Sequence, residues 1–149
     1  SSDIEQIARW GFDHVRIPID YNILQNSDGT IKENGFARIE KAVAQCEKHG
    51  LKVILDLHKT AGFSFDEGET ECGFFDSRKY QEMFYRLWEE FARRFGNDSD
   101  NVVFELLNEV TDKSYIKKWN SISNECIRRI RKFAPPIRSF SLEATTITV

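Results

Sequence analysis

The sequence contains few of the residues that interrupt or cross-link a fold. Its 149 residues include three prolines, eight glycines and three cysteines, which excludes a collagen-like or low-complexity chain. The cysteines are odd in number and far apart, and the sequence has no CxxC motif or Cys/His cluster. Neither a disulfide framework nor a zinc site is therefore supported. We expect Cys46 and Cys126 to pack as small apolar side chains and Cys72 to lie in a loop.

Long hydrophobic runs and an excess of one charge are also missing. No run reaches the roughly 20 apolar residues of a spanning helix, and no signal-peptide pattern opens the sequence. With 21 basic and 24 acidic residues the net charge is -3, which argues against a nucleic-acid or acidic-membrane partner. What the sequence does have is aromatic residues, 13% in all, as in proteins with a large core or an aromatic-lined cleft.

Hydrophobic periodicity predicts helices that alternate with three apolar strands. The strands are HVRIPID (14–20), LKVILDLH (51–58) and VVFELLNEV (102–110). Residues 21–35 are expected to form a polar loop with a turn at Asp28-Gly29, and residues 59–77 a longer loop. Helices are predicted over 3–11, 35–50, 80–96 and 116–133, the last stopped by Pro135-Pro136.

This order of elements predicts an α/β fold with a parallel sheet. Near-continuous apolar strands suggest burial on both faces, and no linker or repeat divides the chain. Two architectures remain, a doubly wound sheet and a (β/α) barrel. No GxGxxG or GxxxxGK[ST] motif follows a strand, which counts against a nucleotide-binding doubly wound domain.

Polar side chains occur in these apolar strands and gather near their carboxyl ends, where both architectures place function. Arg16 lies in the first strand, and His58 ends the second. Arg16 could serve a site or form a structural ion pair, and His58 could be a site residue or a satisfied core histidine. Asp56 and Glu105 lie deeper in their strands, and we interpret both as structural partners, because an unpaired buried charge is costly.

The third strand ends in Asn108-Glu109, two residue types that disfavour strands. An amide beside a carboxylate at a strand end is suited to holding a sugar hydroxyl. Ideal alternation would point the two side chains to opposite faces, so the strand must twist or peel there for both to reach one site. In the loop after the second strand, four phenylalanines either stack on sugar rings or cover the fold: Phe63, Phe65, Phe74 and Phe75.

Taken together, these residues resemble glycoside hydrolase family 5, the cellulase family with a (β/α)8 barrel. The resemblance covers roughly residues 3–135 and rests on DIEQIARWGFDHVRIPIDY, LKVILDLHKTAGFSF, NVVFELLNEV and the helix with Trp119. It implies retaining hydrolysis of β-1,4-glucan, with neither metal nor organic cofactor, by an exported enzyme. Lys59 departs from close relatives, which often have histidine or glycine there, and this bears on substrate preference.

The resemblance also implies a role for each site residue. Glu109 would be the general acid/base, and Asn108 would hold the sugar 2-hydroxyl and the nucleophile. Arg16 would hydrogen-bond the nucleophilic carboxylate, and His58 would line the subsite at the cleaved bond. Phe63 and Phe65 are expected to contribute to substrate binding.

Two parts of the family pattern are missing, the first barrel strand and the C-terminal half with the nucleophile. We therefore expect residues 1–135 to be a partial barrel that is inactive by itself. Alternatives are a related glycanase acting on mannan, xylan or mixed-linkage glucan, a small α/β sugar-binding module, and a half-barrel that pairs with a second copy through its open edges.

The last segment, residues 136–149, resembles nothing in the family. One permitted choice of codons for PIRSFSLEATTITV, read in another frame, gives DPFLLIGGNNYNS, which is similar to the family's fifth strand and following loop. Our hypothesis is that a small insertion or deletion near Ala134 to Pro136 shifted the reading frame, so that residues 136–149 are not a selected sequence. Sequencing of the coding DNA would test it.

Overall fold

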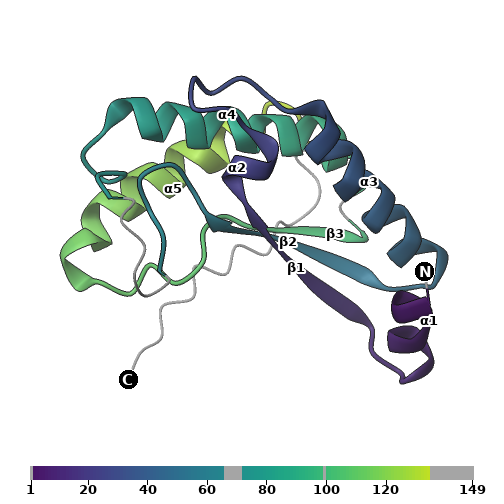
Figure 1. Ribbon diagram of the computed structural model, residues 1–149. Helices are drawn as coiled ribbons and strands as arrows, with labels where there is room; N and C mark the ends of the chain where they lie inside the picture. The colour runs from purple at the N-terminus through teal and green to yellow at the C-terminus, as the bar shows by residue number, and fades with distance from the viewer. Residues whose placement is uncertain (1, 66–71, 99, 135–149) are drawn as a thin grey trace.

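Figure 1 shows a computed structural model of the chain, which describes residues 2–65, 72–98 and 100–134. Three strands form one parallel sheet in the order β1-β2-β3, namely β1 (His14–Asp20), β2 (Lys52–Lys59) and β3 (Val102–Glu105). The helices are α1 (Ser2–Arg9), α2 (Tyr21–Leu24), α3 (Glu33–Lys48), α4 (Arg78–Phe95), the 3-10 helix η1 (Lys113–Tyr115) and α5 (Ile116–Ile130). The hypothesised frameshift and the Pro135-Pro136 stop lie outside the described residues.

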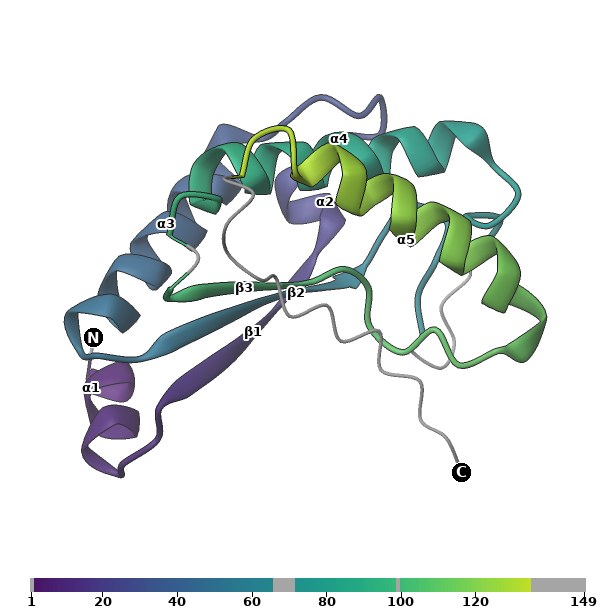
Figure 2. The same ribbon diagram turned by 180° about the vertical axis from the view of Figure 1, so that it is seen from behind.

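Helices α3, α4 and α5 lie along one face of the sheet (Figures 1 and 2). The side chains that β2 and β3 send to this face, Val53, Leu55, Leu57 and Phe104, are almost completely buried. They meet the apolar stripe of α4, where Trp88 lies 5.2 Å from Phe104 between ring centroids. The predicted alternation of helices with parallel strands is confirmed.

The opposite face of the sheet is polar. Parallel register places Pro18 beside Asp56 and Asp56 beside Glu105, so these residues lie in one row across three strands. Burial on both faces was our expectation, and it holds only in part among the described residues, because Asp56 is fully buried on this face but Arg16 is not. On this face the side chain of Arg16 is 38% exposed, while the helix-facing residues are closed off.

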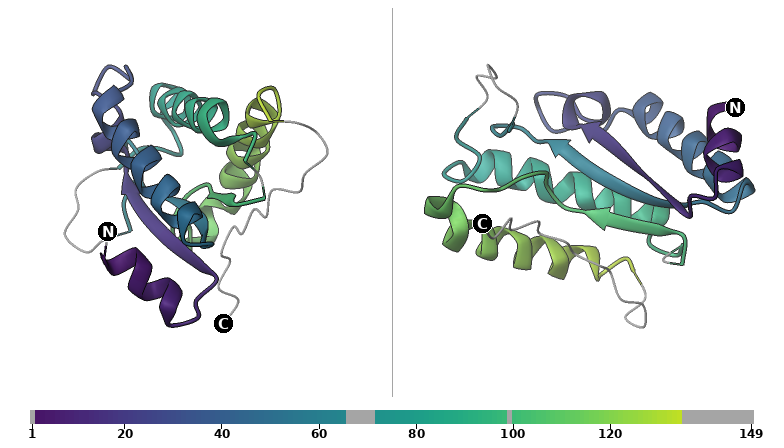
Figure 3. Two further views of the ribbon diagram at one scale, coloured as in Figure 1. Left: turned by 90° about the vertical axis from the view of Figure 1, so that its right-hand side faces the viewer. Right: turned by 90° about the horizontal axis from the view of Figure 1, so that it is seen from below.

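Two arginines tie successive helices together outside the core. Arg94 of α4 pairs with Glu33 of α3 at 2.7 Å and lies over the ring of Phe36. Arg129 of α5 pairs with Glu82 of α4 at 2.8 Å. The helical layer is thereby fixed across its whole width, seen end-on in Figure 3.

The first departure from the predicted elements is α2, a single turn within the expected polar loop. It buries Leu24 completely and passes so close to α3 that a Cβ at Gly35 would lie 2.2 Å from the carbonyl oxygen of Ile23. Four residues are too few to show helical periodicity. The turn at Asp28-Gly29 is confirmed, with Gly29 at φ +84° and the Thr30 amide donating to Asp28.

The second departure is the length of β3, which ends at Glu105 rather than at residue 110. Beyond it the chain is held by other groups. The indole N–H of Trp88 donates to the carbonyl of Leu106 at 3.1 Å, and the amide of Asn108 donates to the carbonyl of Leu57, also at 3.1 Å. The chain peels from the sheet before Asn108-Glu109.

Candidate active site

Arg16 is the hydrogen-bonding centre of the polar face. Its Nε and Nη2 donate to the two carboxylate oxygens of Glu105 at 2.7 and 2.8 Å. Nη2 also lies 2.9 Å from Oδ1 of Asn108 and 2.9 Å from Oδ2 of Asp56. The arginine of β1 therefore joins residues of β2, β3 and the loop after β3.

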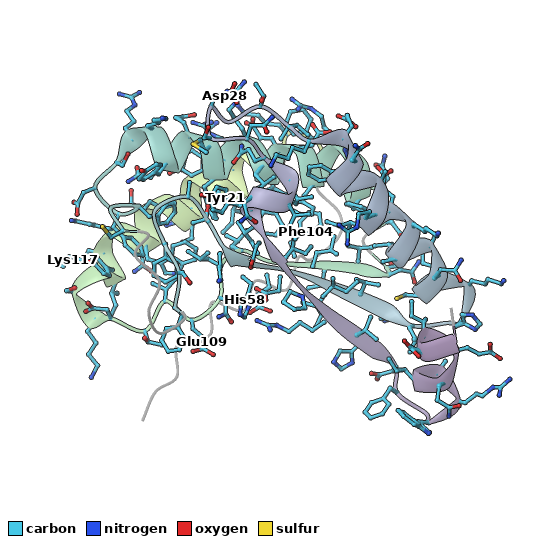
Figure 4. All side chains as sticks on the ribbon, viewed as in Figure 1. Tyr21, Asp28, His58, Phe104, Glu109 and Lys117 are labelled. Carbon is cyan, nitrogen blue, oxygen red and sulfur yellow. The ribbon has the colours of Figure 1, made fainter. Side chains whose placement is uncertain are left out.

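Asp56 lies beneath this arginine and connects it to His58. Its side chain is fully buried, and its Oδ2 lies 2.9 Å from His58 Nδ1. His58, two residues further along β2, is on the same face and keeps 29% of its side chain exposed. Figure 4 shows His58 and Glu109 on the side of the strands away from Phe104.

The backbone at Glu109 departs from that of an extended strand. Glu109 has φ +49°, and it is the non-glycine residue with positive φ in the described chain. A left-handed residue reverses the alternation of a strand, at a cost that ordinary L-residues seldom bear. The chain thus peels from the sheet at this point, as expected, because β3 ends at Glu105 and the backbone of Glu109 is left-handed.

The electrostatics of the cluster follow from its burial. Hydrogen bonding to Glu105 raises the pKa of Arg16, and the nearby charges of Asp56 and Glu109 add to this effect. Burial raises the pKa of Asp56, although the hydrogen bond from His58 and the charge of Arg16 oppose the shift. The arginine stays charged under all ordinary conditions and stabilises carboxylates around it.

The four loop phenylalanines divide into buried and exposed members. Phe74 and Phe75 belong to the core, at 0% and 6% exposure. Phe63 is half-buried and meets Phe75 edge-to-face at 5.6 Å. Phe65 is 50% exposed. The interpretation as a cover holds for Phe74 and Phe75, whereas Phe65 is not part of the core.

Sequence reasoning missed Tyr115, which joins the two loops at this end of the sheet. Its ring stacks on Phe75 with centroids 4.1 Å apart and planes 11° from parallel. Close by, Lys118 of α5 forms an ion pair with Asp76. No periodic signal marks this contact, because both partners lie where regular elements begin.

The described residues were also compared with the requirements of a metal site and of a membrane-spanning helix. They contain no group of three or more His, Cys, Asp or Glu side chains placed to hold a metal ion. None of the helices in this part of the chain is long and apolar enough to span a membrane. As expected, Cys46 and Cys126 are buried thiols and Cys72 is exposed.

The geometry therefore assembles Arg16, His58 and Asn108 through direct contacts or through Asp56, with Glu109 next to them in sequence. Our interpretation of Asp56 and Glu105 as partners of Arg16 agrees with their distances. Such a site can donate a proton from Glu109, hold a hydroxyl through Asn108 or His58, and stabilise an added negative charge beside Arg16.

Comparison with known proteins finds glycoside hydrolases, both as a family model and as individual relatives. The family model described as Cellulase (glycosyl hydrolase family 5) matches residues 1–143. Cellodextrinase A from Ruminococcus flavefaciens is 67% identical over 136 residues, covering 91% of this chain and 40% of that protein. Endoglucanase C from Acetivibrio thermocellus is 39% identical over 132 residues, covering 87% and 38%.

A solved structure shows the same likeness in three dimensions. Cel5A from Thermotoga maritima, in complex with cellobiose, matches with a TM-score of 0.74 and 26% identity, covering 90% of this chain and 41% of that one. The same enzyme has been solved with mannotriose. This chain thus spans about 40% of the length of the relatives it matches.

Proposed function

The chain belongs to glycosyl hydrolase family 5, the cellulase family, and we propose that it carries the acid/base part of a retaining β-1,4-glucanase site. The observation that supports this most directly is the cluster in which Arg16 binds Asn108 at 2.9 Å, with Glu109 as the next residue. Its fold is the corresponding part of a (β/α)8 barrel, in which catalytic residues lie at the carboxyl ends of strands.

In this proposal Glu109 protonates the oxygen of the glycosidic bond and later removes a proton from the attacking water. Asn108 fixes the sugar next to it. Because Oδ1 of Asn108 already accepts from Arg16, its amide NH2 is the group left to donate to a sugar hydroxyl. His58 lines the same subsite, and Phe63 and Phe65 provide apolar ring faces for neighbouring sugars.

A retaining site needs a second carboxylate about 5 to 5.5 Å from the first. Among the described residues, the two carboxylates nearest in the cluster are already engaged. Asp56 is fully buried, and Glu105 is 12% exposed and bound to Arg16 through both oxygens. Neither can reach an anomeric carbon, so we propose that the 149-residue chain alone does not turn over substrate.

The proposed substrate is a soluble β-1,4-glucan of a few sugars. The cellodextrinase at 67% identity supports short cellulose-type chains, and the endoglucanase at 39% supports the same linkage. Mannan is the second candidate, because the related Cel5A has been solved with mannotriose as well as cellobiose. Loops rather than the barrel select between these sugars.

A hybrid enzyme tests the proposal. The matching region of the Ruminococcus flavefaciens cellodextrinase is replaced by residues 1–134 of this chain, and hydrolysis of cello- and manno-oligosaccharides is followed. We expect β-1,4-glucan hydrolysis with retained anomeric configuration by the hybrid and none by the 149-residue chain. Activity of the isolated chain that Glu109→Gln abolishes would contradict its proposed inactivity.

The role of Glu109 is tested in the same hybrid with an aryl cellobioside. Without its general base, Glu109→Gln should accumulate the glycosyl-enzyme and be rescued by azide, which attacks without losing a proton. The control is Glu125→Gln, which removes a surface glutamate paired with Arg128 and Arg129 of α5 and should leave turnover unchanged. Full activity of Glu109→Gln on an unactivated oligosaccharide would refute the assignment.

A further inference from the structure

Asp56 is the most deeply buried member of the polar cluster, and the mechanism above gives it no part. Its Oδ2 lies 2.9 Å from both Nη2 of Arg16 and Nδ1 of His58. Its other oxygen, Oδ1, is buried without a hydrogen-bond partner among the described residues. A buried acceptor used so unevenly is unusual and calls for an explanation.

The two contacts determine where hydrogen atoms can lie. Arg16 can only donate, so Oδ2 of Asp56 is an acceptor in that contact. When its carboxyl group is ionised, Asp56 can only accept, so Oδ2 accepts from His58 and the hydrogen of the neutral imidazole is on Nδ1.

The position of this hydrogen determines what the other ring nitrogen of His58, Nε2, can bind. With its hydrogen on Nδ1, the neutral imidazole has a lone pair on Nε2, and no described residue hydrogen-bonds to that nitrogen. Such a nitrogen accepts from a hydroxyl and rejects a carbonyl or carboxylate oxygen. The same geometry keeps Arg16 in the orientation that binds Asn108.

We propose that Asp56 is a positioning residue that fixes His58 in the Nδ1–H tautomer, so that Nε2 accepts a hydrogen bond from a sugar hydroxyl. Only the identity of the ligand rests on the proposed function. The tautomer follows from contacts within the chain and can be measured without substrate.

Nitrogen NMR of the 149-residue chain labelled with ¹⁵N-histidine tests this directly. The chain has three histidines, and the His58 signals are those lost in His58→Gln. With the imidazole in its neutral form, we expect a protonated Nδ1 and an unprotonated Nε2. A major Nε2–H form in the unmodified chain would overturn the proposal, and this measurement needs no Asp56 variant that might fail to fold.

The second measurement uses Asp56→Asn. The amide of the new asparagine can donate to Nδ1 of His58 and should therefore favour the Nε2–H form. Loss of a charged hydrogen bond should change the tautomer ratio by about tenfold or more. Glu105→Gln is the matched control, since Glu105 binds Arg16 but does not contact His58, and it should preserve the ratio. An unchanged ratio in Asp56→Asn, or an equal change in Glu105→Gln, would count against a specific role for Asp56. An inactive hybrid enzyme would refute the proposed function and leave the tautomer result standing.

Discussion

Arg16 of β1 and Glu105 of β3 are joined by two hydrogen bonds, 2.7 and 2.8 Å long, that pass over β2, the strand between them. The guanidinium lies above Asp56 of that central strand and contacts it as well. A long, forked donor is needed for this span, because it must reach across one strand and still bind a carboxylate through two nitrogens. The pair thus ties the three strands together around Asp56.

Replacing Arg16 by Met should destabilise the chain by about 3 kcal/mol, because two largely buried carboxylates lose their counter-charge. The loss should be smaller at pH 5 than at pH 8. Burial already raises the pKa of Asp56, and without Arg16 the carboxyl group would take up a proton more readily. Urea unfolding at the two pH values measures both effects.

The control for this variant is Arg9→Met, which removes an exposed arginine paired with Glu5 of the same helix. An exposed pair contributes at most about 1 kcal/mol, so this change should be small at both pH values. If Arg9→Met and Arg16→Met lowered the free energy of unfolding equally, the contacts of Arg16 with the buried carboxylates would add no more stability than an exposed ion pair.

A second pH effect is expected at the other end of the sheet, where Glu47 of α3 meets Asp98. A hydrogen bond to Asp98, burial and repulsion raise the pKa of Glu47 to about 7. The folded chain holds this proton where the unfolded chain releases it, so its stabilising effect is complete below pH 4.5 and is lost as the pH rises to about 7. Glu47→Gln keeps a donor for Asp98 and should avoid this loss.

The stability of Glu47→Gln relative to the unmodified chain should therefore increase between pH 5 and pH 8, by about 1 kcal/mol after allowance for solvent screening. Glu125→Gln is the comparison. Hydrogen bonds from Arg128 and Arg129 lower the pKa of Glu125 to about 2, so it is ionised throughout this range and its effect should stay constant. A parallel pH response of the two variants would disprove the assignment.

The loop contact between Phe75 and Tyr115 should matter for the segment that carries Glu109. Tyr115→Ala removes a ring stacked at 4.1 Å and should cost about 1 to 2 kcal/mol. We also expect faster hydrogen exchange at the amide of Asn108, which donates to Leu57. Tyr115→Phe retains the stack and should exchange at the original rate, whereas equal exchange in both variants would show that the loops are not coupled.

The sequence predicted the sheet and its helices because burial of apolar faces repeats at fixed intervals along a strand or helix. It also predicted Asp56 or Glu105 as partners of Arg16, since charged groups within apolar strands require partners, and both pairs are present. What it could not predict were features that arise from contacts between distant segments. The turn of α2 packs on Gly35, the indole of Trp88 binds the carbonyl of Leu106 just after β3, and the stack of Tyr115 on Phe75 joins two loops. None of these contacts has a periodic signature.

The left-handed backbone of Glu109 should affect the free energy of unfolding of variants at this position. At φ +49° a side chain with a Cβ is strained, whereas glycine is not. Glu109→Gly should therefore be more stable than Glu109→Ala by about 1 kcal/mol, as measured by urea unfolding. The same pair of substitutions at Glu125, within α5, should show the reverse order, because glycine weakens a helix by about 1 kcal/mol relative to alanine.

If Glu109→Ala proved the more stable of its pair, the left-handed conformation would be wrong, and with it the explanation of how Asn108 and Glu109 reach one site. If the order is as expected, a side chain with a Cβ is strained at position 109, and such local strain is typical of functional sites.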